Sequence, residues 1–286
     1  MPRPAGYPPI EDLLERYGHL GLTDVHNHGA GPGVGSSLRR LWADMKLRRV
    51  VLFGSVSEPR SVSDDEDTWR AFLDQPDLVV PFFCGFDLRD ESCLDVVREK
   101  LDRGFVGLGE VAAASSFSEA VSDSAWKGHH PMDGFLPRIY EICAEYGAPV
   151  LLHIDPLSGE ELARFEEALD SFPNTTFIIA HVNAHTPPHT AAALLAAHDN
   201  LYADFYAGFT DRNPASNDSL QDFVAVARDF PDRWLLGSDS GYGIGGEAAS
   251  VESMYRFIHL LDDEPIARKI AFENFDRILA GRQTTS

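Results

Sequence analysis

Residues 149–182, PVLLHIDPLSGEELARFEEALDSFPNTTFIIAHV, contain the pattern that decides the fold. Two apolar runs, 149–154 and 175–182, flank the amphipathic stretch 159–171, which has Ser158 available as an N-cap. Apolar runs without polar alternation are typical of strands that are covered on both faces. The stretch therefore predicts a strand, a helix and a second strand, which is the repeating unit of a parallel sheet.

The same alternation continues in both directions along the chain. Apolar runs rich in β-branched and aromatic residues are separated by helix-length stretches such as 134–146. We expect strands at 22–28, 49–55, 78–87, 105–111, 149–154, 175–182, 201–206 and 234–239. Eight such units in 286 residues match an α/β fold of the closed (β/α)8 TIM-barrel type, whereas an open doubly wound sheet usually has fewer strands. No repeat or flexible linker interrupts the pattern, so residues 1–286 are predicted to form one domain.

Composition limits the expected partners and location. The chain has 24 basic and 45 acidic residues, a net charge of −21, which disfavours nucleic acid and anionic membranes. Cys84, Cys93 and Cys143 form no CxxC motif, and we expect Cys84 to be a buried, small apolar residue. Residues 1–9 lack the apolar run of a signal peptide, and no segment is long enough to span a membrane. These features predict a cytoplasmic protein and leave homo-oligomer formation open.

Metal-binding residue types follow several predicted strands. His26 and His28 stand two apart at the end of the first, where the period of a strand places both on one side. Alone, this pair also fits an ordinary turn. Later strands end in further side chains of this kind: Glu110, His153, His181 and Asp239. Because barrel active sites are built from the carboxyl ends of the strands, we expect all six side chains to converge on one or two divalent ions.

These motifs resemble the amidohydrolase superfamily, in its TatD-like and amidohydrolase-related branches. The resemblance covers HNH at 26–28, GEV at 109–111, LLH at 151–153, AH at 180–181, GSD at 237–239 and the closing segment 270–279. It implies that His26, His28 and Asp239 bind one metal, that His153 and His181 bind a second, and that Glu110 bridges them. Family members with one metal use the HxH pair, one later histidine and the aspartate.

Two departures from the family pattern narrow the chemistry. The fourth strand has no bridging lysine, so Glu110 takes that place if two metals bind. Ser238 and Ser240 flank Asp239, whereas the best-known nucleases of the family have threonine before this aspartate. We expect zinc, with manganese, nickel or iron left open, because imidazole and carboxylate suit several ions.

The expected reaction is hydrolysis of a small-molecule amide, ester or lactone-type bond. Water on the metal ionises near neutral pH, and the hydroxide is the expected nucleophile. Asp239 would act as general base and acid, and Glu110 is the second predicted catalytic residue. Alternatives are a one-metal decarboxylase, a TatD-like deoxyribonuclease or phosphodiesterase, and a non-catalytic binding barrel. The charge of −21 weighs against the nuclease.

Two long connections, 112–132 and 206–219, are predicted to form the rim that contacts substrate. Candidate substrate-binding residues there and nearby are His129, His130, His185, Tyr206 and Tyr242, of which the three histidines also fit a solvated loop. Three carboxylates near strand ends could orient metal-binding imidazoles or be ordinary surface groups. These are Asp24, Asp155 and Asp204.

Overall fold

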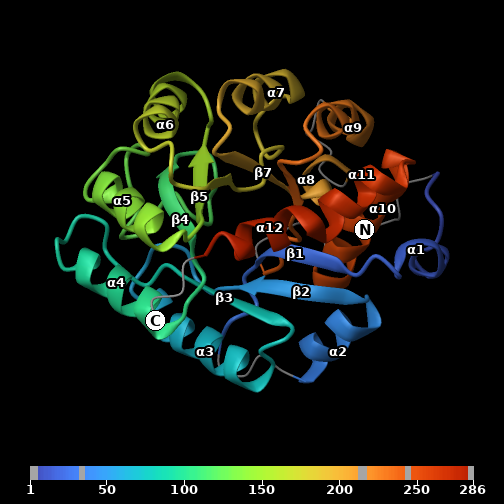
Figure 1. The fold of residues 1–286 in the computed structure, drawn as a ribbon, viewed down its shortest axis with the longest axis horizontal. Coiled ribbons are helices and arrows are strands. Elements are labelled where there is room, and N and C mark those ends of the chain that lie inside the picture. Colours follow the sequence, from blue (N-terminus) through green and yellow to red (C-terminus); the bar gives the residue numbers. More distant parts are fainter. Residues whose placement is uncertain (1–5, 32–35, 212–217, 242–245, 283–286) are drawn as a thin grey trace.

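Eight parallel strands surround a common axis and alternate with helices on the outside (Figure 1). This is a computed structural model, and it describes residues 6–31, 36–211, 218–241 and 246–282. Each strand pairs with the next in chain order, from β1 to β8. A bridge between Asn27, at the end of β1, and Ser240, beyond β8, closes the ring. The predicted (β/α)8 barrel is confirmed.

The strands lie where the apolar runs predict them, with different ends. Their bounds are β1 Leu22–Asn27, β2 Leu47–Leu52, β3 Val79–Phe83, β4 Gly107–Ser115, β5 Val150–Asp155, β6 Phe177–Ile179, β7 Leu201–Phe205 and β8 Trp234–Leu236. β6 and β8 stop before the predicted His181 and Asp239, and β4 continues four residues past the predicted end at 111. The polar residues after β6 and β8 therefore belong to the rim rather than to the paired ladder.

Helices cover the barrel. Their bounds are α1 Ile10–Tyr17, α2 Ser36–Asp44, α3 Ser61–Asp74, α4 Cys93–Arg103, α5 Leu136–Tyr146, α6 Gly159–Ser171, α7 Pro188–Ala197, α8 Ala207–Asp211, α9 Leu220–Asp229, α10 Glu247–Leu261, α11 Glu264–Arg268, the π-helix η1 Lys269–Glu273 and α12 Asn274–Ala280. α6 has the predicted bounds, but the side chain of Ser158 makes no capping hydrogen bond. The predicted rim connection 206–219 begins with α8.

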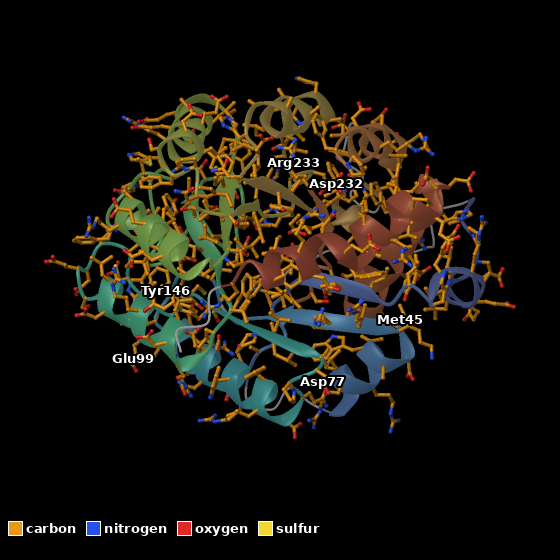
Figure 2. All side chains as sticks on the ribbon, in the orientation of Figure 1. Met45, Asp77, Glu99, Tyr146, Asp232 and Arg233 are labelled. Atoms are coloured by element: carbon orange, nitrogen blue, oxygen red, sulfur yellow. The ribbon has the colours of Figure 1, made fainter. Side chains whose placement is uncertain are left out.

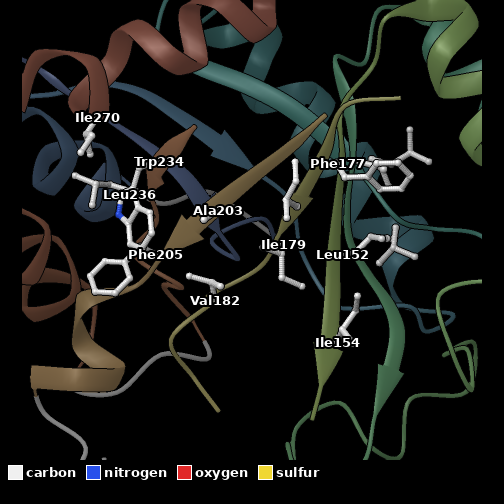
Figure 3. Close-up of a cluster of buried hydrophobic side chains, with 14 of the residues drawn as sticks. Leu152, Ile154, Phe177, Ile179, Val182, Ala203, Phe205, Trp234, Leu236 and Ile270 are labelled. Carbon is white, nitrogen blue, oxygen red and sulfur yellow. The ribbon is translucent and has the colours of Figure 1, made fainter. Parts of the chain in front are cut away.

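Side chains of the strands alternate between the inside of the barrel and the helices. On β5, Leu151 belongs to the inner cluster together with Ile178 of β6 and Leu235 of β8. Leu152 and Ile154 face outward into the larger cluster shared with the helices, as Figure 3 shows. Both sides of β4, β5 and β6 are buried along their whole length, which explains why these sequences are largely apolar.

The amino end of the barrel is plugged by α12, which crosses in front of the strands in Figure 1. Its Phe275 and Ile278 join the inner cluster, and the ring of Phe275 lies 6.5 Å from that of Phe82. In the same orientation, Figure 2 labels Met45, Asp77 and other residues that come just before strands, so this face carries the amino ends. The polar residues that end the strands are at the opposite face.

Two sequence expectations concern the chain as a whole. Cys84, Cys93 and Cys143 are buried free thiols, as expected of Cys84. Within the described residues, every helix is too short or too polar to cross a membrane.

Candidate active site

His26 and His28 aim their Nε2 atoms at the same point. The Nδ1 of His26 lies 2.8 Å from the Oδ2 of Asp204, and the Nδ1 of His28 lies 2.8 Å from the carbonyl oxygen of Gly54. Because both partners accept hydrogen bonds, each Nδ1 carries the proton. In the neutral form that can bind a cation, each ring directs an Nε2 lone pair toward the other ring, and the two Nε2 atoms lie 3.0 Å apart.

Glu110 lies between this pair and a second pair of histidines. Its Oε2 is 3.6 Å from the Nε2 of His26 and 3.5 Å from that of His28. Its Oε1 is 2.9 Å from the Nδ1 of His153 and 3.1 Å from the Nε2 of His181. The carboxylate is buried inside the barrel mouth. Each of its two oxygens therefore serves a different histidine pair.

The second pair has the same arrangement of lone pairs. The Nε2–H of His153 donates a hydrogen bond of 2.7 Å to the Oδ2 of Asp155, so the neutral ring, the form that can bind a cation, has its lone pair on Nδ1. That Nδ1 atom is 3.2 Å from the Nε2 of His181. Both nitrogens face the Oε1 of Glu110.

Asp239 completes the first group from the far side of the mouth. Its Oδ1 lies 3.3 Å from the Nε2 of His28 and 3.5 Å from that of His26. Asp239 and His181 both have positive φ angles, 45° and 31°. Such backbone is uncommon outside glycine and tends to occur at functional sites, where the surrounding structure holds it in place.

This donor set fits divalent ions. Lone pairs and carboxylate oxygens that face one another repel unless a cation or a proton lies between them. Ligand atoms about 2.1 Å from one ion lie about 3.0–3.5 Å from each other, close to the observed spacings of 2.9–3.6 Å. The potential ligand atoms form two buried groups, and within each group all atoms lie within 4.8 Å of one another. The groups are His26, His28 and Glu110, and Glu110, His153 and His181. Asp239 would join the first.

The charges inside the mouth shift the pKa values of its acids and bases in opposite directions. Burial alone would raise the pKa of Glu110, but His153 and His26 hold it well below its usual value. The pKa of Asp239 is also lowered, since His28 and His26 outweigh burial. Burial would lower the pKa of His153, but Glu110 and Asp155 raise it to about 9. The carboxylates of Glu110 and Asp239 are thus ionised at neutral pH, and neighbouring positive charge stabilises them.

The three carboxylates near strand ends are buried rather than on the surface. Asp204 and Asp155 accept from the ligand-side imidazoles of His26 and His153. Asp24 instead receives the backbone N–H of His26 and both the hydroxyl and backbone N–H of Ser238. Burial raises the pKa of Asp24 to about 6. It links the ends of β1 and β8, and among the described residues its hydrogen-bond partners are backbone N–H groups, the hydroxyl of Ser238 and the amide of Asn27.

A cavity of about 170 Å³ opens above the second histidine pair. Polar groups from this site form its floor, and its walls are partly apolar. The lining residues are Glu110, Ser118, Ala120, Val121, His153, Asp155, His181, Ala184, His185, Phe209 and Asp239. The cavity joins the candidate ligands to space that suits a small molecule.

The predicted substrate residues occupy different places. His185 lines the cavity. His129 is exposed and His130 accepts a hydrogen bond from the backbone of Met132, and neither belongs to the described cavity lining. Tyr206 is buried, with its hydroxyl 2.9 Å from Ser250. Tyr242 lies outside the described residues.

Several lining residues were not singled out in the sequence. Val121 and Ser118 come from the connection after β4, and Phe209 comes from α8. Phe209 packs edge-on against His181, with ring centroids 5.4 Å apart. An apolar residue in a rim loop has no pattern of its own, so only its position beside the histidine marks it.

The barrel and its carboxylate-bridged histidine pairs define a class of metal-dependent (β/α)8 enzymes. The chain belongs to the amidohydrolase family, because the family model described as Amidohydrolase matches residues 23–280. It is therefore a metal-dependent enzyme of the amidohydrolase superfamily, as the sequence motifs predicted. No protein of curated function matches the sequence.

Solved structures share the fold at low sequence identity. An uncharacterized TIM-barrel protein from Bordetella bronchiseptica is 18% identical, with a TM-score of 0.63 over 95% of this chain and 91% of its own. A Burkholderia multivorans amidohydrolase with bound zinc is 15% identical, with a TM-score of 0.61 over 91% and 99%. A dihydroxybenzoic acid decarboxylase from a Polaromonas species, with bound manganese and 2-nitroresorcinol, is 13% identical, with a TM-score of 0.56 over 91% and 97%. At these identities the likeness concerns the fold alone.

Proposed function

We propose that the protein hydrolyses an amide, ester or lactone-type bond in a small uncharged molecule, with two divalent ions. The observation that carries the proposal is the position of Glu110, whose Oε2 faces His26 and His28 while its Oε1 faces His153 and His181. A single-ion site needs only one of these groups. A carboxylate shared between two buried histidine pairs is what a two-ion site requires.

The residues of the chain would share the work as follows. His26, His28 and Asp239 would hold one ion, His153 and His181 would hold a second, and Glu110 would serve both; the ions would supply Lewis-acid activation of water and of a carbonyl oxygen. Asp239 lines the cavity, so its carboxylate accepts a proton from the attacking water and returns it to the leaving group. The lowered pKa of Asp239 keeps its carboxylate ionised at neutral pH. Zinc or manganese would suit the donors.

The cavity walls support an uncharged substrate. Ala120, Val121, Ala184 and Phe209 provide apolar surface. Among the described lining residues, none is lysine or arginine, so a phosphodiester or other strong anion would lack a side-chain cation. This favours hydrolysis of a neutral bond over the nuclease alternative.

Ion counting tests the proposal directly. We expect two Zn²⁺ per chain in the wild-type protein, measured by equilibrium dialysis and metal analysis, and fewer than two in Glu110→Gln. Glu160→Gln, an exposed carboxylate on α6 with 70% of its side chain accessible, is the matched control and should bind two. One ion in both the wild type and Glu110→Gln would overturn the two-ion proposal.

A substrate panel tests the reaction. The zinc- or manganese-loaded protein should hydrolyse members of a panel of small lactones, aryl esters and amides, and activity should be lost with a chelator. Release of CO2 from an aromatic carboxylic acid without hydrolysis of any panel member would favour the one-metal decarboxylase instead. Homo-oligomer formation stays a prediction.

A further inference from the structure

The carboxylate of Asp155, at the end of β5, accepts more hydrogen bonds than a single orienting contact needs. Its Oδ2 receives the Nε2–H of His153 at 2.7 Å, the hydroxyl of Ser115 at 3.0 Å and the backbone N–H of Ser118 at 3.1 Å. Its Oδ1 receives the backbone N–H groups of Ser116 at 2.7 Å and Phe117 at 2.9 Å. Only 2% of the residue is exposed.

The hydrogen bond between Asp155 and His153 decides which nitrogen of His153 is available to bind a cation. Residues 151, 153 and 155 share the inward side of β5, since side chains two apart on a strand lie on the same face. Asp155 can only accept, so the proton of the imidazole is held on Nε2. The Nδ1 lone pair is thereby left toward Glu110 and His181.

The hydrogen bonds from residues 115–118 to Asp155 position one wall of the cavity. Four consecutive residues, 115–118, are tied to the carboxylate, and Ser118 lines the cavity. The ring of Phe117 meets the imidazole of His185 edge-on, with centroids 5.5 Å apart, and His185 is another lining residue. The wall therefore takes its position from the same carboxylate that orients His153.

We propose that Asp155 is a positioning residue that couples the second ion site to the substrate cavity. One carboxylate sets the nitrogen with which His153 binds a cation and also the position of the wall 115–118. The proposal rests on the two-ion site of the proposed function. It implies that replacing this carboxylate lowers the affinity for the second ion selectively and makes the wall 115–118 less ordered.

The test is Asp155→Asn, with Zn²⁺ alone as the probe. The side-chain amide N–H would face Nε2 of His153, which favours a proton on Nδ1 and blocks the second site. Second-ion affinity should fall roughly 10–100-fold, the usual effect of losing an orienting partner, while the first ion is retained. In hydrogen exchange, the amides of residues 116–118 should exchange faster than in the wild type.

Two variants separate this role from a general structural effect. Asp133→Asn is the matched control, because Asp133 accepts the backbone N–H of His129 at 2.9 Å in the same connection without holding a histidine ligand, and it should bind two ions. Asp204→Asn should weaken binding of the first ion, since Asp204 orients His26. Because Asp204 also holds the backbone of His181, the readout that separates the two variants is hydrogen exchange at 116–118, which Asp204→Asn should leave unchanged.

Unchanged affinity for both ions in Asp155→Asn would overturn the proposal, even if the wall loosens. If that variant does not fold, ¹⁵N-histidine NMR of the zinc-loaded wild type decides. We expect the proton of His153 on Nε2, and a proton on Nδ1 would overturn the proposal. If the wild-type protein binds only one ion, the proposed two-ion function is contradicted. The NMR experiment still tests whether Asp155 holds the proton of His153 on Nε2.

Discussion

The Nδ1 atom of His26 lies 2.8 Å from the Oδ2 atom of Asp204, which is buried on β7. The same oxygen receives the backbone N–H of His181 at 2.9 Å. One carboxylate thus orients the imidazole of His26, in the first histidine pair, and holds the backbone of His181, in the second. This arrangement requires that β1, β6 and β7 end around the same point, which only the closed barrel provides.

Replacing Asp239 by asparagine tests its part in proton transfer. Asparagine can still offer an oxygen to an ion but cannot accept a proton at neutral pH. We expect kcat to fall by about 10²- to 10⁴-fold, the usual effect of removing a general base, with KM changed much less. Steady-state kinetics and metal analysis on the same sample separate this from ion loss. Asp232→Asn, at the opposite end of the barrel, should match the wild type; a kcat for Asp239→Asn within twofold of wild type would contradict the role.

His185 and His129 should differ in their effect on substrate binding. His185 lines the cavity, whereas His129 is exposed and outside the described lining. For an ester that the wild type hydrolyses, His185→Ala should raise KM about three- to tenfold, which corresponds to roughly 1 kcal/mol of lost contact. His129→Ala should leave KM unchanged. Equal effects of the two variants would remove His185 from the binding surface.

Asp65 should make folding stability depend on pH. Burial raises its pKa to about 7, and Lys100, 3.7 Å away and closer to Glu66, offsets this only in part. Between about pH 4 and 7 the folded protein keeps a proton that the unfolded chain has released, so stability decreases as pH rises through this range. From pH 5 to 8 the loss is about 3 kcal/mol, at about 1.4 kcal/mol for each of two units below the folded pKa.

Urea unfolding at pH 5 and pH 8 measures this loss, and Asp65→Asn is the reference. The variant lacks the titrating group, so its stability should change about 3 kcal/mol less than that of the wild type over this interval. A constant cost of the substitution at both pH values does not affect the comparison. Equal pH dependence in the two proteins would show that Asp65 is ionised when folded.

The plug at the amino end should support stability without touching the site. Phe275 is 1% exposed and packs in the inner cluster, so Phe275→Ala should lower the free energy of unfolding by about 3–5 kcal/mol. The metal content of Phe275→Ala should equal that of the wild type. Phe117→Ala is the control for stability, because that ring is 60% exposed and little apolar burial is lost. Urea denaturation with metal analysis checks both.

Much of the barrel could be predicted from the sequence. Continuous apolar runs such as VLL at 150–152 reveal strands buried on both faces, and their spacing leaves room for helices. Strand ends were less predictable. β6 and β8 stop at Ile179 and Leu236 because pairing ends where the backbone turns toward the mouth, and that turn has no hydropathy signal.

The sequence by itself determined the repeat of strands and helices and the residue types at the strand ends, because burial and periodicity are local properties. Only the tertiary structure decided which atoms meet. The division of Glu110 between two histidine pairs and the hydrogen bonds of Asp155 and Asp204 join segments up to 178 residues apart. The tautomers of His26 and His28 follow from partners on other strands, which no local pattern encodes, whereas His153 has its partner Asp155 two residues along β5.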